Sequence, residues 1–221
     1  MKNDILRVAV FMDGNYFSKV NEYYRFCHHA KRNINLPGLF EFIREKVSFF
    51  EEINKKYCQV VENHWFRGRF TTSNMEQKYQ DDLRRLTQLT HERKMSDIFM
   101  HMGIVQHVFP MQINPVTGEA HEKGIDVWLS LEAFELAYLK KFDVLVLVAG
   151  DSDYVPLVRK LNGIGTRVLV LGWELDAEGG NRPVRTSQSL LDECSYPLIM
   201  NTIIDDKTNK NNAIVQAIFG Q

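Results

Sequence analysis

The sequence predicts an α/β protein in which strands alternate with helices around a mostly parallel central sheet. Short apolar runs without polar alternation, such as residues 144–148, are typical of strands buried on both faces. Segments with helical periodicity separate these runs, as in consecutive βαβ units. Two of the runs end shortly before an aspartate in a turn that contains glycine, at Asp13 and Asp151. Because open α/β sheets bind ligands beyond the carboxyl ends of their strands, we expect function at these turns.

In the first half of the chain, strands are predicted to alternate with helices. The clearest helix has Phe42, Ile43 and Val47 at helical spacing after a Pro-Gly pair. A charged segment with an apolar stripe indicates the next helix, and Asn-Pro and Thr-Gly pairs indicate a hairpin-like excursion. The expected elements are strands at 7–12, 57–66 and 98–109, helices at 17–26, 39–54 and 75–94, and the excursion at 111–122.

The second half repeats the alternation. A helix is expected from about residue 123 to residue 139, and the loop at 173–188 is polar, rich in glycine and expected to be mobile. The remaining expected elements are strands at 144–148 and 167–171, a helix at 156–161, a helical turn at 189–194 and a strand or edge segment at 196–204. The apolar positions of the helix at 123–139 are expected to form one broad buried face; they are Val127, Leu131, Phe134, Leu136 and Tyr138.

Composition predicts an ordinary globular protein. The 221 residues are 44% hydrophobic and 25% charged, which is enough to bury a substantial core in one domain. We expect this domain over residues 1–204, with a polar linker and a short C-terminal tail over residues 205–221. The formal net charge is −1, so any surface that binds nucleic acid must be local.

The cysteines and the apolar runs indicate the compartment. Three widely spaced cysteines without a C-x-x-C pair argue against a disulfide framework and a zinc knuckle, and they fit the reducing cytoplasm. No apolar run approaches about 18 residues, so no membrane span is expected. No apolar run follows a basic segment at the N-terminus, so no signal peptide is expected. A homo-oligomer is left open.

Four aspartates are expected to meet at one edge of the sheet. Asp13 and the pair Asp151 and Asp153 follow the carboxyl ends of parallel strands, and Asp126 begins the helix that leads into the strand before Asp151. One aspartate before a helix serves as an N-cap, whereas two carboxylates around Ser152 favour a metal site. Oxygen ligands without clustered His or Cys favour Mg²⁺ or Mn²⁺ over Zn²⁺. Such a site suits the hydrolysis of phosphodiesters.

Three blocks of this sequence resemble the NYN domain family of the PIN-like nuclease superfamily. They are Asp13-Gly14-Asn15, Lys123-x-x-Asp126, and Gly150-Asp151-Ser152-Asp153-Tyr154 with Pro156 and Gly165, within a resemblance over about residues 7–200. The resemblance implies a three-layer, Rossmann-like topology and metal-dependent cleavage of RNA. It implies Asp13, Asp126, Asp151 and Asp153 as metal ligands and Asn15 as the group that orients a water or phosphate.

Other polar residues have two interpretations each. Arg67 and Arg69, beside aromatic residues, can track phosphates and stack bases, or they are solvated residues above the core. Lys123 can reach the substrate or be solvated, and Ser152 can donate to a phosphate or cap a helix. Some NYN members carry an acid where this chain has Glu132, but Glu132 does not share a helix face with Asp126, so a surface or helix-pairing role is expected.

His28 and His29 resemble a metal pair, but adjacent residues on a helix point apart, so surface positions are expected. The alternatives to a ribonuclease are another phosphoryl-transfer enzyme and a non-catalytic RNA-binding or regulatory module with a vestigial site. A Toprim-like nuclease needs Glu in place of Asp13, and an aspartyl-phosphate phosphatase needs Asp in place of Asn15. The near-neutral charge favours the binding module somewhat, and DNA is not excluded as the nucleic acid.

Overall fold

A parallel sheet of six strands forms the centre of the computed structural model, which describes residues 5–78, 82–114, 116–176 and 183–219. The strand order is β3-β2-β1-β6-β7-β8, and every neighbouring pair is parallel. The predicted parallel sheet is therefore confirmed. Its strands are β1 (Leu6–Asp13), β2 (Cys58–Arg69), β3 (Val105–Pro110), β6 (Val144–Val148), β7 (Arg167–Gly172) and β8 (Tyr196–Ile199).

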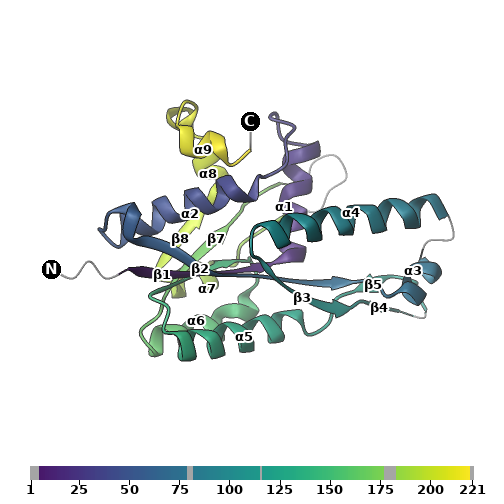
Figure 1. The fold of residues 1–221 in the computed structure, drawn as a ribbon. Coiled ribbons are helices and arrows are strands. Elements are labelled where there is room, and N and C mark those ends of the chain that lie inside the picture. Colours follow the sequence, from purple (N-terminus) through teal and green to yellow (C-terminus); the bar gives the residue numbers. More distant parts are fainter. Residues whose placement is uncertain (1–4, 79–81, 115, 177–182, 220–221) are drawn as a thin grey trace.

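Helices cover both faces of this sheet, which confirms the three layers (Figure 1). One face packs against α1 (Gly14–Phe26), α2 (Leu36–Phe50), α4 (Asp82–His101) and α9 (Ala213–Ala217). The other packs against α5 (Ile125–Lys140), α6 (Val155–Gly163) and α7 (Gln188–Glu193). Among the described helices, none is both long enough and apolar enough to cross a membrane. The short elements are α3 (Thr72–Lys78), α8 (Met200–Ile204), β4 (Gln112–Ile113), β5 (Ala120–His121) and the 3₁₀ turns η1 (Lys55–Tyr57), η2 (Ser152–Tyr154) and η3 (Lys207–Asn209).

Alternate residues of each central strand supply two cores. In β1, Val8 and Val10 face the core under α1 and α2, whereas Ala9 and Phe11 face the core over α5 and α6. All five residues of β6 are buried, which is why that strand shows no polar alternation. The predicted hairpin-like excursion is confirmed, because β4 and β5 pair in antiparallel fashion.

The boundary between α4 and β3 differs from the prediction of a strand at 98–109. The helix continues to His101, because Phe99 packs into the core while Met100 is exposed. Gly103, with φ of +65°, ends the helix in the left-handed conformation that glycine adopts most easily. The expected strand at 196–204 is also shorter, since β8 ends at Ile199 and α8 follows.

The C-terminal segment, expected to be a polar linker and tail, packs on the domain. The Asn212 side chain accepts hydrogen bonds from the backbone N–H groups of Ile214 and Val215 and so caps α9. Val215 and Ile218 are buried in the core beside α2. Gly38 permits this close approach, because a Cβ there would lie 1.9 Å from the Ala217 carbonyl oxygen.

Helix α5 does not bury the face expected from the sequence. Val127, Leu131 and Tyr138 are 57%, 65% and 55% exposed. The helix is apolar around most of its circumference, so its periodicity leaves open which side faces the sheet. Small residues allow the closest approach to the strands, and the buried side is Ile125, Leu129, Ala133 and Ala137.

The loop at 173–188, expected to be mobile, has packed arms. Leu175 and Val184 form an isolated antiparallel bridge, and both side chains are buried, as is Trp173. Residues 177–182 lie outside the described residues. The arms bring residues from beyond β7 back to the carboxyl end of β6, where the Ser187 N–H donates to the Gly150 carbonyl at 2.7 Å.

Candidate functional site

The sheet places Asp13 and Asp151 at a topological switch point. From β1 the chain continues to β2 on one side, whereas β6 lies on the other side of β1 and leads away to β7. Met12 and Val148 form the last pair between β1 and β6. Asp13 follows Met12 directly and Asp151 lies three residues after Val148, so both lie at the crevice where open α/β sheets bind ligands.

Asp13 is anchored by hydrogen bonds to both of its oxygens. Its Oδ1 accepts from the backbone N–H groups of Asn15 and Tyr16, both at 3.0 Å, and so caps α1. Its Oδ2 accepts from the Tyr154 hydroxyl at 3.2 Å. Burial raises the pKa of Asp13 despite these hydrogen bonds and the charge of Lys19. Among the described residues no ion pair joins this carboxylate, so its charge is costly unless a cation binds.

Asp151 presents a more open carboxylate. Its Oδ1 accepts from the Asp153 N–H at 3.0 Å and from the Ser152 hydroxyl at 3.3 Å. No hydrogen bond between described residues engages its Oδ2. Ser152 thus orients Asp151, and Asp151 caps η2 as the N-cap interpretation expects.

Asp13 and Asp151 line one open cavity of about 450 Å³. Two positive side chains, Lys19 and Arg185, line the same cavity, together with Asn15, Tyr16, Gly150, Ser152, Pro183, Val184 and Ser187. Carboxylates that hold a metal ion and ammonium groups that attract phosphate are the two requirements of a phosphodiester site. This cavity combines two carboxylates with the ammonium group of Lys19 and the guanidinium group of Arg185.

Asp126 and Asp153 line a second hollow, of about 200 Å³, between α5 and α6. Tyr154 lies near both groups: burial raises its pKa most, and Asp13, Asp126 and Asp151 raise it further. Among the described residues, no three of the four aspartates bring their ligand oxygens within 4.8 Å of one another. The four predicted ligands are therefore divided between two hollows, with Asp13 and Asp151 in the first and Asp126 and Asp153 in the second.

Asp13 and Asp151 offer to one cavity the carboxylate oxygens that hard divalent cations prefer as ligands. Such an ion keeps several waters and needs only one or two protein carboxylates. The carboxylate of Asp13 is partly buried, and burial raises its pKa, so a bound cation would stabilise its charged form.

The predicted substrate-binding residues lie outside this cavity, apart from Ser152. Arg67 and Arg69 line a smaller cavity of about 80 Å³ between β2, β3 and α4, with Trp65 and Phe99 among its lining residues. The Arg69 Nε lies 4.0 Å from Glu92 Oε2, at the limit of an ion pair. Lys123 is exposed directly before α5.

Sequence reasoning missed Lys19, Arg185, Tyr154 and Glu122. Lys19 lies one helical turn after Asn15, so helical periodicity was a signal for it. Glu122 accepts a hydrogen bond from the Gly68 N–H at 2.7 Å, and burial raises its pKa, as does Asp13. Arg185 comes from the distant arm of the 173–188 loop and has no local signal.

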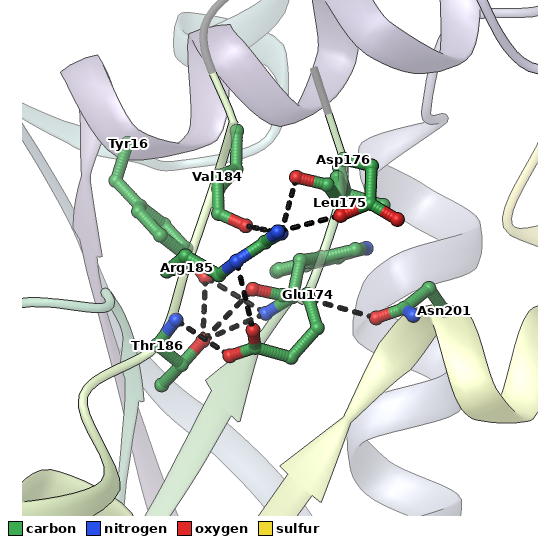
Figure 2. A network of polar contacts seen from close by, with 9 residues as sticks. Tyr16, Glu174, Leu175, Asp176, Val184, Arg185, Thr186 and Asn201 are labelled. Atoms are coloured by element: carbon green, nitrogen blue, oxygen red, sulfur yellow. Dashed lines mark hydrogen bonds and ion pairs between the residues drawn. The ribbon is translucent and has the colours of Figure 1, made fainter. Parts of the chain in front are cut away.

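Arg185 joins the two arms of that loop (Figure 2). Its Nη1 donates to the carbonyl oxygens of Leu175 and Val184, and its Nη2 pairs with Asp176 at 2.6 Å. Its Nε lies 3.6 Å from Glu174 Oε2. Because its donors are engaged by the loop, Arg185 shapes the cavity wall. Of the two positive side chains that line the cavity in the described part of the chain, Lys19 is therefore the one available to a ligand.

The same network connects the loop to α1. The Trp173 N–H donates to the Tyr16 hydroxyl at 2.7 Å and to Thr186 Oγ1 at 3.0 Å, and the two hydroxyls lie 2.9 Å apart (Figure 2). Burial raises the pKa of Tyr16 to about 12, so its hydroxyl stays protonated. The walls of the cavity are thus fixed by buried hydrogen bonds.

His28 and His29 are closer than expected, because α1 ends at Phe26 and both follow in a turn. Their ring centroids lie 3.9 Å apart, and with Asp205 their ligand atoms lie within 4.8 Å of one another. The His28 Nδ1 accepts from the Ala30 N–H at 3.2 Å, which leaves the proton on Nε2, 2.9 Å from Asp205 Oδ1. A metal on Nε2 would require a proton on Nδ1 that faces the Ala30 N–H. The arrangement therefore favours a hydrogen bond between His28 and Asp205 over a metal site.

A second histidine pair predicts pH-dependent stability. His64 Nδ1 and His107 Nε2 lie 2.9 Å apart, and His64 Nε2 lies 3.1 Å from Glu62 Oε2. Burial lowers the pKa of both histidines. The free energy of unfolding should therefore be highest above about pH 6.5, the pKa of histidine in the unfolded chain. Below that pH the unfolded chain binds protons that the folded protein does not, and the free energy of unfolding should fall by up to about 1.4 kcal/mol per pH unit for each histidine.

Urea titrations at a series of pH values test this prediction. His107→Phe keeps the stacking on Phe66, whose ring centroid lies 4.1 Å away, and should flatten the loss of stability below pH 6.5. The exposed His121→Phe is the matched control and should keep the wild-type slope. An unchanged slope in His107→Phe would contradict the assignment.

The fold and the site together define a class: a three-layer parallel α/β domain with aspartates at its switch point, as in PIN-like nucleases. The NYN domain family matches residues 7–201, and the chain belongs to this family of PIN-like nucleases. The resemblance of the three sequence blocks is thereby confirmed at the level of the family.

Curated proteins and solved structures do not extend the family assignment. No curated protein matches the chain. Among solved structures, MurG of Acinetobacter baumannii is 12% identical over 75% of this chain and 35% of its own, with a TM-score of 0.30. A chitinase of Chromobacterium violaceum is 12% identical over 89% of this chain and 56% of its own, with a TM-score of 0.29. The chain thus spans about a third and just over half of these structures, and such distant likenesses carry no argument about function.

Proposed function

We propose that the protein hydrolyses RNA phosphodiester bonds with Mg²⁺ or Mn²⁺ in the cavity between Asp13 and Asp151. The observation that carries the proposal is the partly buried carboxylate of Asp13, which shares a cavity with Asp151 and Lys19 at the switch point of the sheet. The NYN family supplies the nuclease class. A carboxylate pair beside the ammonium group of Lys19, which makes no ion pair among the described residues, suits a metal ion and a phosphate together.

Asp13, whose Oδ2 accepts a hydrogen bond from the Tyr154 hydroxyl, and Asp151, whose Oδ1 accepts from the Asp153 N–H, would together hold the ion. When bound, the ion would activate water and stabilise charge on the phosphate. Tyr154 and Ser152 keep the two carboxylates oriented. Hydrolysis joins the oxygen of water to phosphorus and breaks the bond to the leaving oxygen, which takes up a proton.

The other residues act on the substrate. Asn15 is exposed on the cavity wall, where its amide can orient a water or a phosphate oxygen. Lys19 attracts the phosphate. Asp126 and Asp153, on the other side of Tyr154, form a second acidic pair that can hold a further cation or position the first through water. Arg67 and Arg69 continue from β2 beyond the level of Asp13 and can contact the next phosphates.

A cleavage panel tests the proposal. Labelled single-stranded and structured RNA and DNA are incubated with Mn²⁺, Mg²⁺ or EDTA, beside Asp151→Asn. The exposed Asp97→Asn on α4 is the matched control, since it makes the same change outside the cavity. We expect metal-dependent cutting of RNA that Asp151→Asn loses by roughly 10²–10³-fold and Asp97→Asn keeps. Equal activity in the two variants would contradict the site.

A non-catalytic RNA-binding module is the second candidate. It is favoured by the spacing of the aspartates, because no three of them cluster within 4.8 Å among the described residues. The formal net charge of −1 does not separate the two candidates, since nucleases and binding modules alike need only local basic surface. RNA retained in a gel shift without cutting under any metal condition would support this candidate.

A further inference from the structure

The outward face of α5 is apolar. Val127, Leu131 and Tyr138 are more than half exposed, and Phe134 lies between them in sequence and is partly buried. Soluble monomers rarely leave a continuous row of large apolar side chains in water, and such rows mark interaction surfaces. We call this row the α5 seam.

The spacing of the α5 seam is that of paired helices. Successive members are four, three and four residues apart, which is the 3.5-residue repeat of a helix that packs against another helix. At 100° per residue the four positions fall within a sector of about 60°. The helix buries a different side, centred on Leu129 and Ala133, against the sheet. Helix α5 therefore has one apolar face for its own sheet and a second on which Val127, Leu131 and Tyr138 stay largely exposed, although Phe134 packs partly against the core and the Lys141 Nζ lies 4.5 Å from the Tyr138 ring centroid.

The groove beside the seam carries opposite charges at its two ends. Toward the start of α5, Asp126 and Asp153 line the hollow that Val127 and Leu131 also line. Toward the end of α5, Phe134 lines a hollow with Arg159 and Lys160 of α6. Arg159 is paired with Glu193, whereas Lys160, and Lys141 over the Tyr138 ring, make no ion pair among the described residues and leave this end basic. The face thus runs from an acidic end, across an apolar middle, to a basic end.

We propose that the α5 seam and the adjoining surface of α6 bind a second copy of this chain, with the two α5 helices antiparallel. A two-fold axis through the middle of the seam places each acidic end against the basic end of the other copy, as an isologous interface requires. It also sets Val127 of one copy beside Tyr138 of the other and aligns the helix dipoles favourably. A parallel arrangement would instead set like charges together.

The size of the face predicts a weak dimer. Helix α5 has 16 residues, so it is about 24 Å long, and with α6 the face is about 20 Å wide. Each copy would bury on the order of 500 Å², and a total near 1,000 Å² lies at the lower limit of specific interfaces. We therefore expect a reversible dimer that forms at micromolar concentrations.

Sedimentation of the full chain from about 1 to about 100 µM tests the proposal. The wild type should shift from monomer to dimer over this range, and Leu131→Glu should stay monomeric. Leu86→Glu on α4 is the matched control, because Leu86 is 60% exposed and Leu131 65% exposed. It should dimerise as the wild type does. Circular dichroism confirms that both variants are folded.

Lys160→Glu tests the charge argument separately. It leaves the seam intact but sets acid against acid at both ends, and should weaken dimerisation at least about tenfold at low salt. A wild type that is monomeric at the highest concentration would overturn the proposal. So would a dimer that survives Leu131→Glu but is lost in Leu86→Glu, which would place the interface on α4. Because the readout is mass, the result is independent of the proposed nuclease activity.

Discussion

Asp13→Asn is expected to abolish metal-dependent cleavage and, at the same time, to stabilise the metal-free protein. The activity should fall by roughly 10²–10³-fold or more, because the variant loses a charged ligand at the centre of the cavity. An asparagine keeps the Oδ1 that caps α1, and its amide can still bond with the Tyr154 hydroxyl. The change therefore removes the charge with little loss of hydrogen bonding.

The gain in stability follows from the raised pKa of Asp13. A carboxyl whose pKa is higher in the folded than in the unfolded protein costs stability above the folded pKa, and this cost disappears as the pH falls to the unfolded value near 3.8. At neutral pH the ionised carboxylate therefore destabilises the folded protein, and the neutral side chain of Asn removes this destabilisation. A bound metal ion should offset the same destabilisation in the wild type and so raise its free energy of unfolding.

Thermal unfolding in EDTA and in Mn²⁺ measures both effects. The wild type should gain stability on adding Mn²⁺, whereas Asp13→Asn should start higher in EDTA and gain little. Asp97→Asn, exposed on α4, should behave as the wild type in both conditions. A wild type that is unaffected by Mn²⁺, or an Asp13→Asn protein that is less stable in EDTA, would contradict this account of the carboxylate.

Gly150→Ala is expected to destabilise the protein by about 1–3 kcal/mol and to reduce cleavage. A Cβ at this position would lie 2.4 Å from the Arg185 carbonyl oxygen and 2.5 Å from the Tyr16 ring. The carbonyl belongs to backbone held by the Arg185 network, so it cannot move aside cheaply. The turn between β6 and η2 must shift, and Asp151 shifts with it.

Gly163→Ala is the matched control, because a Cβ there meets nothing within 4 Å. It should leave both the free energy of unfolding and the cleavage rate near their wild-type values. Denaturant titration and single-turnover cleavage of the two variants give the comparison. Equal stability of Gly150→Ala and Gly163→Ala would show that the cavity wall is looser than its hydrogen bonds indicate.

Local sequence patterns determined the fold class and the rim of the sheet at which the acidic residues lie. Full burial of β6 follows from an apolar run without alternation, and the direction of parallel strands places Asp13 and Asp151 at one rim. These features depend on residues within one strand and its turn. They are therefore readable without knowing what packs against them.

Tertiary packing decided the features that depend on distant residues. The same apolar pattern of α5 is compatible with more than one buried side, and only the fit of Ala133 and Ala137 against the strands selects one. The polar composition of the C-terminal segment predicts a linker and gives no sign that Val215 and Ile218 are buried. They are buried because they pack against α2.

The division of the aspartates into two pairs was likewise decided by packing, since Tyr154 lies among them and donates to Asp13. Lys19 and Arg185 reach one cavity from segments more than 160 residues apart in sequence, through α1 and the arms of the 173–188 loop. Sequence periodicity reports the local environment of a residue, whereas a cavity is formed by side chains whose proximity arises only when the layers pack together. That is why the rim was predictable and the composition of its cavity was not.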